Sequence, residues 1–568
     1  MFRSLPKDAV EFKIWPWPKI EPYFTDLRQR PLNQETMADW LADWSQLSKL
    51  VDEAYWRLYV AQTRDTTNSL FEKQFNTFVD EIQPQTRAQD QKLREKLLAS
   101  GLEPRGYDMA LRNLRTQTNL FRESNLALLS EEKKLVAEHD RLTGAQTVSW
   151  EGQELTIPQI YPIFQEHDRS KREQAWRLAS ERQLADRQAI NELWEAFLKV
   201  RLKLTENADL PDYRSYRWME LLRLDYTPED CICFQEAIAE VVVPAASLLY
   251  DKRRKRLGVE RLRPWDLEVD PFKLPPLRPY KTIGELVTKT QEIFNQVDPI
   301  LGEYFTVMRN GDLLDLDNRK GKAPGGYCCS YAAAGVSFIY TNAVGIHDDV
   351  QTLLHEGGHA FHNFECGHLP FQLQELPLEF CEVASMSMEL LGSPYITLEK
   401  GGFYTAQEAA QAKREALERT LLFWPYMAVV DAFQHWVYKD PQSAFDPAQC
   451  DHKWGELWLR FMPDIDWGGL EQSMVTGWQR KAHIFQDPFY YVEYGLAQLG
   501  ATQIWRNALK DQRQAVANYR EALALGSSVT LPELYAAAGA KLSFDAPPLK
   551  EAVELILTTI EGLERQLK

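Results

Sequence analysis

Apolar residues between positions 34 and 135 recur at intervals of three and four, the spacing of amphipathic helices. A helical pattern also runs from Ser170 to about Leu204, and the chain is again mostly helical in pattern from about Thr405. Strand-like alternation is scarce, so we expect a mainly α fold. The clearest stretch is MADWLADWSQLSKLVDEAYWRLYV, whose recurring positions are Trp40, Leu41, Trp44, Leu47, Val51 and Tyr55.

Three segments depart from this pattern. The segment 147–157 alternates around Glu151-Gly152 and predicts a short hairpin. The stretch VSFIYT, near the end of 321–342, predicts a strand that follows a Gly-Gly loop. That strand is either an edge strand able to pair with an extended peptide or an ordinary buried strand, and the sequence allows both interpretations. The proline-rich segment 263–280 is expected to be an extended loop.

Composition narrows the class of protein. With 568 residues, 44% hydrophobic and 26% charged, the chain is typical of a soluble globular protein. We expect a cytoplasmic location and no membrane partner, because no apolar run reaches roughly 18–20 residues and no signal segment opens the chain. The net charge of −17 argues against nucleic acid as a partner. We place a domain boundary near residue 205, between an N-terminal helical region (1–205) and a catalytic region (206–568).

The seven cysteines are predicted to be reduced. Cys231 and Cys233 stand too close in sequence for an ordinary disulfide, as do Cys328 and Cys329. The Cys231-Ile-Cys233 motif has no second pair at the spacing of a zinc ribbon, so a structural role is predicted for it.

The segment LLHEGGHAFH, residues 353–362, lies in a helix expected to begin near Asp348 and to end at Gly367. Gly357 and Gly358 inside it each disfavour the helix by roughly 1 kcal/mol relative to alanine. We expect their missing side chains to leave room for the backbone of another helix and for substrate.

The same segment carries the pattern H-E-x-x-H, typical of zinc peptidases. His355 and His359 lie about 40° apart around the helix and one turn along it, so both imidazoles can reach one Zn²⁺. Glu356 is placed to take a proton from a water at the metal. The alternative is a buried helix with satisfied histidines.

A third ligand is expected from a second helix within 375–394. Glu379 follows His359 by twenty residues, the spacing found in thermolysin, and Glu382 lies three residues further. The two are only about 60° apart around the helix, so geometry leaves both open. The helix carries four carboxylates in all: Glu375, Glu379, Glu382 and Glu389.

The two segments HEGGHAFH and EFCEVASMSMEL together resemble the zinc oligopeptidase family of thimet oligopeptidase and oligoendopeptidase F, above all its short bacterial Pz-peptidase-like members. The resemblance covers most of residues 150–568. It implies that Glu382, between Phe380 and Ser385, is the third ligand. It also implies a two-lobed helical shell around a deep substrate channel, with a small β-sheet near the zinc and the lobes interleaved along the chain.

Two further residues are expected beside the metal. Glu389 lies two turns, roughly 10.5 Å, beyond Glu382, so it cannot share the ion but can hold a ligand imidazole by its other nitrogen. The alternative is a solvated surface carboxylate. His362, three residues after His359, is expected beside the ligands or in the core.

Near the C-terminus, the segment 481–501 is rich in aromatic residues, which are usually core. The family resemblance implies instead that its histidine and tyrosines lie over the zinc and donate a hydrogen bond to the oxyanion of the intermediate. Spacing does not decide which tyrosine does so. These residues are His483, Tyr490, Tyr491 and Tyr494.

Together these observations predict a cytosolic zinc metalloendopeptidase that holds one Zn²⁺ and hydrolyses short oligopeptides. One alternative is a zinc exopeptidase of carboxypeptidase or dipeptidyl carboxypeptidase type, which needs a fixed cationic group to hold a terminal carboxylate. Another is a non-catalytic peptide-binding protein on the same scaffold. The intact H-E-x-x-H motif argues against this second alternative.

Overall fold

The computed structural model describes residues 2, 4–319, 321–323 and 325–567. The chain forms two compact units, and each unit is assembled from three separate stretches of sequence. Unit 1 comprises Met1–Asn119, Arg278–Ala409 and Gly500–Leu542, and unit 2 comprises Leu120–Leu277, Ala410–Leu499 and Ser543–Lys568. The division into regions 1–205 and 206–568 stays a prediction.

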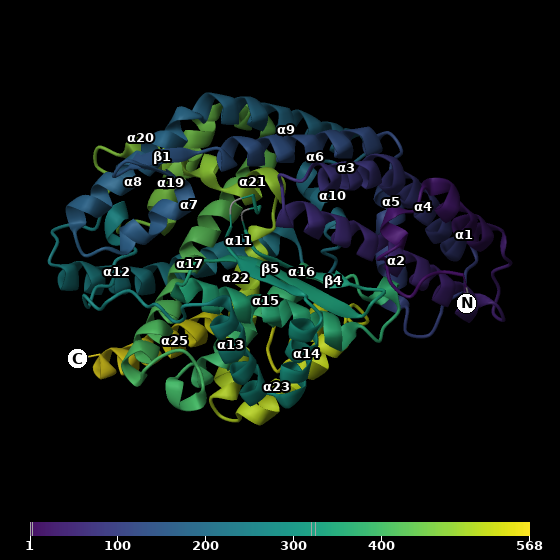
Figure 1. The fold of residues 1–568 in the computed structure, drawn as a ribbon. Coiled ribbons are helices and arrows are strands. Elements are labelled where there is room, and N and C mark those ends of the chain that lie inside the picture. Colours follow the sequence, from purple (N-terminus) through teal and green to yellow (C-terminus); the bar gives the residue numbers. More distant parts are fainter. Residues whose placement is uncertain (1, 3, 320, 324, 568) are drawn as a thin grey trace. The chain divides into compact units, whose positions relative to one another are not determined.

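The mainly α class is confirmed (Figure 1). In unit 1 the aromatic stripe of the first long helix packs into the core, where Trp40 and Trp44 are fully buried. The elements of this unit are α1 (Trp17–Gln29), α2 (Met37–Arg64), α3 (Ser69–Thr77), α4 (Gln83–Ala99), α5 (Asp108–Leu120), α13 (Ile283–Val297), α14 (Pro299–Asn310), β3 (Leu314–Asp317), β4 (Tyr327–Tyr331), β5 (Val336–Ala343), α15 (His347–Cys366), α16 (Leu378–Gly392), α23 (Gln512–Ala524) and α24 (Leu531–Ala537).

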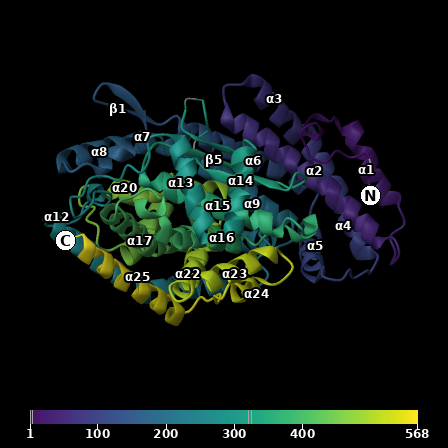
Figure 2. The same ribbon diagram turned by 60° about the horizontal axis from the view of Figure 1, so that its bottom comes forward.

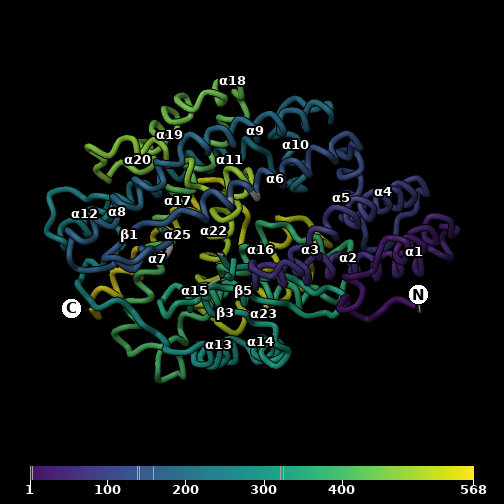
Figure 3. Tube along the Cα trace, turned by 45° about the horizontal axis from the view of Figure 1, so that its top comes forward, coloured from purple at the N-terminus to yellow at the C-terminus, as the bar shows by residue number. Residues whose placement is uncertain are grey.

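Unit 2 is also helical, apart from the predicted hairpin, in which Trp150 pairs with Gln153. Figure 3 shows α6 and α9 running alongside each other in this unit. Its elements are α6 (Asn125–Gly144), β1 (Thr147–Trp150), β2 (Gln153–Thr156), α7 (Ile157–Ile160), α8 (Arg169–Ala185), α9 (Arg187–Asn207), α10 (Tyr213–Glu220), α11 (Pro228–Ala237), α12 (Val243–Leu257), α18 (Pro441–Ala444), α19 (Pro447–Phe461), α20 (Glu471–Val475), α21 (Ala482–Gln486) and α25 (Ala546–Gln566). Two further helices, α17 (Ala406–Lys439) and α22 (Tyr491–Ala508), contain residues of both units, as does α5 by its last residue, Leu120.

The single helix expected from Ser170 to Leu204 is wrong, because the chain breaks at Asp186 into α8 and α9. The Asp186 carboxylate accepts a hydrogen bond from Gln146 at 2.9 Å and pairs with Arg182 at 2.8 Å. At Asp186 the backbone has φ of −92° and ψ of 3°, and its N–H donates to the carbonyl oxygen of Gln183, three residues earlier. The helix therefore ends in a tight turn, and the spacing of apolar residues does not mark this turn.

The strand VSFIYT lies in β5, at the centre of a three-stranded sheet ordered β3-β5-β4. β3 pairs with it in parallel and β4 antiparallel, with Cys328 opposite Ile339. The edge-strand expectation for this segment is therefore wrong, and the buried-strand alternative is confirmed. α15 packs against β4 and β5 and, on another side, against α16 (Figure 1).

The N-terminus of α15 is organised by Asp349 rather than by Asp348. The helix begins at His347, and one carboxylate oxygen of Asp349 accepts hydrogen bonds from the backbone N–H groups of Gly345 at 2.7 Å and Ile346 at 2.8 Å. An acidic side chain in the first turn is favourable because it binds N–H groups that have no partner in the helix. The predicted end at Gly367 is confirmed.

The paired glycines of α15 are explained by close packing on two sides. A Cβ atom at Gly358 would lie 2.5 Å from the carbonyl oxygen of Ala384 and 2.6 Å from the Cα of Ser385, both in the backbone of α16. A Cβ atom at Gly357 would lie 2.5 Å from the ring of Phe294 in α13. Only glycine therefore permits this approach of the two helix backbones.

One helical stretch of the described chain, Pro228–Leu257, is long and apolar enough to cross a bilayer by length and composition alone. Of its most apolar window, 44% is buried within the protein. A core helix passes the same test, so a single stretch of this kind is weak evidence for a membrane span.

We predict that Gly358→Ala lowers the free energy of unfolding by about 1–3 kcal/mol or more, because the added methyl group meets rigid backbone. The measurement is the midpoint of thermal or denaturant unfolding. Gly562→Ala is the matched control, since that glycine lies inside α25 with no heavy atom near its Cβ position. There alanine should be neutral or stabilising. Equal stability of the two variants would contradict the packing argument.

Candidate metal centre

Three potential metal ligands from two neighbouring helices converge in unit 1. The ligand atoms of His355 and His359 on α15 and of Glu382 on α16 all lie within 4.8 Å of one another. Oε2 of Glu382 is 3.4 Å from Nε2 of His355 and 3.8 Å from Nε2 of His359. Ligands about 2.0–2.2 Å from a tetrahedral zinc ion are separated by roughly 3.3–3.5 Å, so this donor set fits the ion.

Hydrogen bonds hold these donors in place. Nδ1 of His355 lies 2.8 Å from Oε1 of Glu389, which leaves Nε2 directed to the centre. The Ser385 hydroxyl donates to Oε2 of Glu382 at 3.0 Å. Such hydrogen bonds fix the orientation of the ligand rings and carboxylates. Histidines that bind zinc usually have a partner of this kind at their other ring nitrogen.

The electrostatics of the centre favour a cation. Burial lowers the pKa of His355, but its hydrogen bonds with Glu382 and Glu389 outweigh burial and raise that pKa well above 6.5. The positive charge of this imidazole thus balances the negative charge of the two carboxylates. Burial lowers the pKa of His359 to about 4, so that ring is neutral, as metal binding requires.

Glu356 is buried beside the two histidines but is not one of the converging ligands. Its Oε2 has no hydrogen-bond partner in the described part of the chain. Burial raises the pKa of this carboxyl group to about 7; Glu382 and Glu389 add to the shift, while His355 opposes it. A buried carboxylate oxygen without a partner is suited to accept a proton from a bound molecule.

The structure distinguishes between the two carboxylates of α16 that spacing along the sequence left as equal candidates for the third ligand. Among the described residues, the converging group contains Glu382 and not Glu379, although both side chains are buried on α16. His362 is also outside that group. Its ring is fully buried and lies 5.8 Å from the ring of Phe380. Neither of its nitrogens has a hydrogen-bond partner among the residues that the structure describes.

The histidine and tyrosines near the C-terminus form an aromatic cluster in unit 2. The His483 ring centroid lies 5.1 Å from that of Tyr491, 5.8 Å from that of Tyr490 and 5.9 Å from that of Tyr494. Tyr491 is buried, whereas the other three rings are partly exposed. Their role in catalysis stays a prediction.

Two contacts that shape the centre could not be anticipated from the sequence. The backbone of Cys381 hydrogen-bonds the His359 side chain, and Tyr519 on α23 donates its hydroxyl to the Ala384 carbonyl oxygen at 2.9 Å. Figure 2 shows α23 and α24 beside α16. Backbone groups carry no sequence signal, and residue 519 lies 135 positions from its partner.

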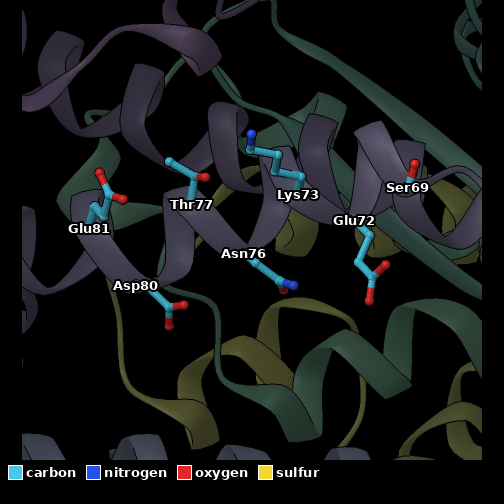
Figure 4. Close-up of a pocket in the computed structure, with 7 residues that line it drawn as sticks. All are labelled: Ser69, Glu72, Lys73, Asn76, Thr77, Asp80 and Glu81. Carbon is cyan, nitrogen blue, oxygen red and sulfur yellow. The ribbon is translucent and has the colours of Figure 1, made fainter.

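A separate hollow of about 320 Å³ lies along α3 and the helical turn that follows it (Figure 4). Its walls carry charged side chains such as Lys73, Asp80 and Glu81. None of the described residues that line it is a histidine or a cysteine, and none belongs to the centre on α15 and α16.

Comparisons with known proteins agree with this geometry. The chain is similar to the solved structure of Pz peptidase A with an inhibitor, with 27% identity over 97% of this chain and 98% of that one and a TM-score of 0.89. It is also similar to a putative oligoendopeptidase F, with 26% identity, the same coverage and a TM-score of 0.90. A putative oligoendopeptidase F from Bacillus anthracis str. Ames shares the fold, with 24% identity, 97% coverage of both chains and a TM-score of 0.85.

A search of curated proteins returns no match. The sequence profile of peptidase family M3 matches residues 163–554, more than half of the chain. The chain therefore belongs to peptidase family M3.

Proposed function

We propose that this member of peptidase family M3, a zinc metalloendopeptidase, cleaves short peptides at internal bonds with zinc held by His355, His359 and Glu382. The observation that carries the proposal is the convergence of these three ligands next to Glu356, whose buried carboxylate has an oxygen without a partner. Zinc, when bound, supplies a Lewis acid that polarises the scissile carbonyl group and lowers the pKa of water.

Glu356 is the proton carrier in this proposal. Its carboxylate accepts a proton from the attacking water and delivers it to the nitrogen of the leaving amine. The position directly after His355 on α15 keeps the carboxylate beside the ligands without making it one of them. Glu389 and Ser385 act through other residues, because they hold His355 and Glu382 in orientation.

His483 and the tyrosines at 490, 491 and 494 are proposed to donate to the developing oxyanion, a contribution typically of about 3–4 kcal/mol for one well-placed donor. Tyr490 and Tyr494 are partly exposed, so their hydroxyl groups are the better candidates than that of buried Tyr491. We place the enzyme in the cytoplasm, in keeping with its free cysteines, all seven of which are unbridged.

We predict that Glu356→Gln lowers kcat by about 10²–10⁴-fold while the zinc content stays that of the wild type, because the change removes a proton acceptor and no ligand. The measurement is the turnover of an internally quenched peptide, together with metal analysis. Glu365→Gln is the matched control: the residue lies on the same helix and pairs with Arg520 at 2.7 Å. Near-normal turnover of Glu356→Gln would show that another group is the base.

The third ligand is tested by comparing two alanine variants of α16. Glu382→Ala should lose one equivalent of zinc and all measurable activity, because it removes a charged donor from the centre. Glu379→Ala should keep the zinc content of the wild type, since its carboxylate is not among the converging atoms. The readout is zinc content after dialysis against a graded series of chelators. The opposite result would transfer the third ligand to Glu379.

Endopeptidase and exopeptidase action are distinguished by a quenched peptide blocked at both ends. We expect the enzyme to cleave it at a rate within about tenfold of the peptide with free ends, because zinc and Glu356 act on the scissile bond itself. Mass analysis of the products gives the position of cleavage. Failure on the blocked peptide, with release of terminal residues from the free one, would instead identify an exopeptidase.

A further inference from the structure

A second group of metal-ligating side chains lies in unit 2. Sγ of Cys231, a carboxylate oxygen of Asp431 and a ring nitrogen of His435 all lie within 4.8 Å of one another. We propose that these three residues form a second, structural metal site, built for Zn²⁺ and independent of the centre on α15 and α16.

The site is built from two helices. Cys231 and Gln235 are one turn apart on α11, and Asp431 and His435 are one turn apart on α17. Residues four positions apart lie on the same face of a helix, so each helix presents two polar side chains to the other. The Cys231 and Asp431 side chains are fully buried and His435 is 5% exposed.

Such deep burial of polar groups requires partners. Oδ1 of Asp431 and both ring nitrogens of His435 have no hydrogen-bond partner among the described residues. Nε2 of His435 and Oδ2 of Asp431 are 3.5 Å apart, longer than a normal hydrogen bond between such atoms. A buried carboxylate with one oxygen left without a partner is disfavoured. A cation between the two side chains satisfies both.

The geometry and the donor types fit zinc. Around a tetrahedral zinc ion the ligand nitrogen and oxygen atoms are about 3.3 Å apart, close to the 3.5 Å found between His435 and Asp431. Thiolate, imidazole and carboxylate are all ligands of this ion. Gln235 donates to Oδ2 of Asp431 at 2.7 Å and so orients the carboxylate, as neighbours of metal ligands usually do.

The same three residue types also occur in cysteine hydrolases, but this site does not suit a nucleophile. No surface of Cys231 is exposed, so a substrate cannot reach its sulfur. The His435 ring is enclosed by aromatic residues, with its centroid 5.2 Å from the ring of Phe489 and 5.9 Å from that of Trp218. A closed, buried surrounding is typical of a structural metal ion.

The ion would also support the segment that leads to the tyrosine cluster. Phe489 directly precedes Tyr490 and adopts a left-handed backbone with φ of 64°, which is rare for a bulky residue. Its backbone N–H donates to Gln434 at 2.7 Å, and Gln434 is the neighbour of His435 on α17. Metal binding by His435 thus fixes the part of α17 that holds this strained residue.

Cobalt substitution tests the proposal, because only the second site contains sulfur. Wild-type enzyme stripped of metal and reconstituted with Co²⁺ should bind two equivalents and show a thiolate-to-cobalt charge-transfer band in the near ultraviolet. Cys231→Ser and His435→Ala should lose the band and one equivalent of metal. Cys450→Ser is the matched control, since Cys450 is a buried thiol of unit 2 outside the cluster. This variant should keep the charge-transfer band and both equivalents of cobalt.

Variants of the first centre separate this proposal from the proposed function. The His355→Ala and His359→Ala double variant should lose peptidase activity but retain the charge-transfer band and one equivalent of cobalt. The wild-type spectrum alone is decisive if Cys231→Ser fails to fold. A wild type that binds one equivalent of cobalt with no thiolate band would overturn the second site and leave the first untouched.

Discussion

The contact between the backbones of α15 and α16 at Gly358 is the constraint on which the metal centre depends. A methyl group there would lie 2.5 Å from a carbonyl oxygen of the second helix, so any other residue pushes the helices apart. The carboxylate of Glu382 reaches the two histidines only at this separation. The loss of helix propensity at the two glycines, about 2 kcal/mol, is small beside the free energy of binding a zinc ion.

Around this contact, neighbouring groups hold each of the three ligand side chains in its orientation. Glu389 holds His355 through the nitrogen that faces away from the centre, Ser385 holds Glu382, and the backbone of Cys381 holds His359. The balance of charge is equally local, since a cation at the centre would lie beside the carboxylate of Glu382 and the neutral imidazole of His359. The proposed roles of zinc and Glu356 follow from an environment in which every donor already has a fixed direction.

Unit 2 uses the same arrangement of facing helices for a different purpose. Cys231 on α11 meets Asp431 and His435 of α17 in a buried position. There one carboxylate oxygen and both ring nitrogens have no hydrogen-bond partner among the described residues. In unit 1 the cluster includes partly exposed histidines, as a substrate requires, whereas in unit 2 it is closed. The solvent exposure of the ligand side chains therefore distinguishes the proposed catalytic site from the proposed structural site more clearly than the ligand types do.

The sequence by itself determined the helical class, the hairpin at 147–157 and the placement of His355, Glu356 and His359 on one helix, because each depends on residues close together in the chain. The choice of Glu382 rested on resemblance, since a separation of about 60° around a helix cannot tell it from Glu379. Only the tertiary structure decided which carboxylate lies beside the histidines, that β5 is a central strand, and that Cys231 meets residues 200 positions away. The physical reason is that local periodicity fixes which face a side chain occupies, whereas the packing of distant elements fixes what that face meets.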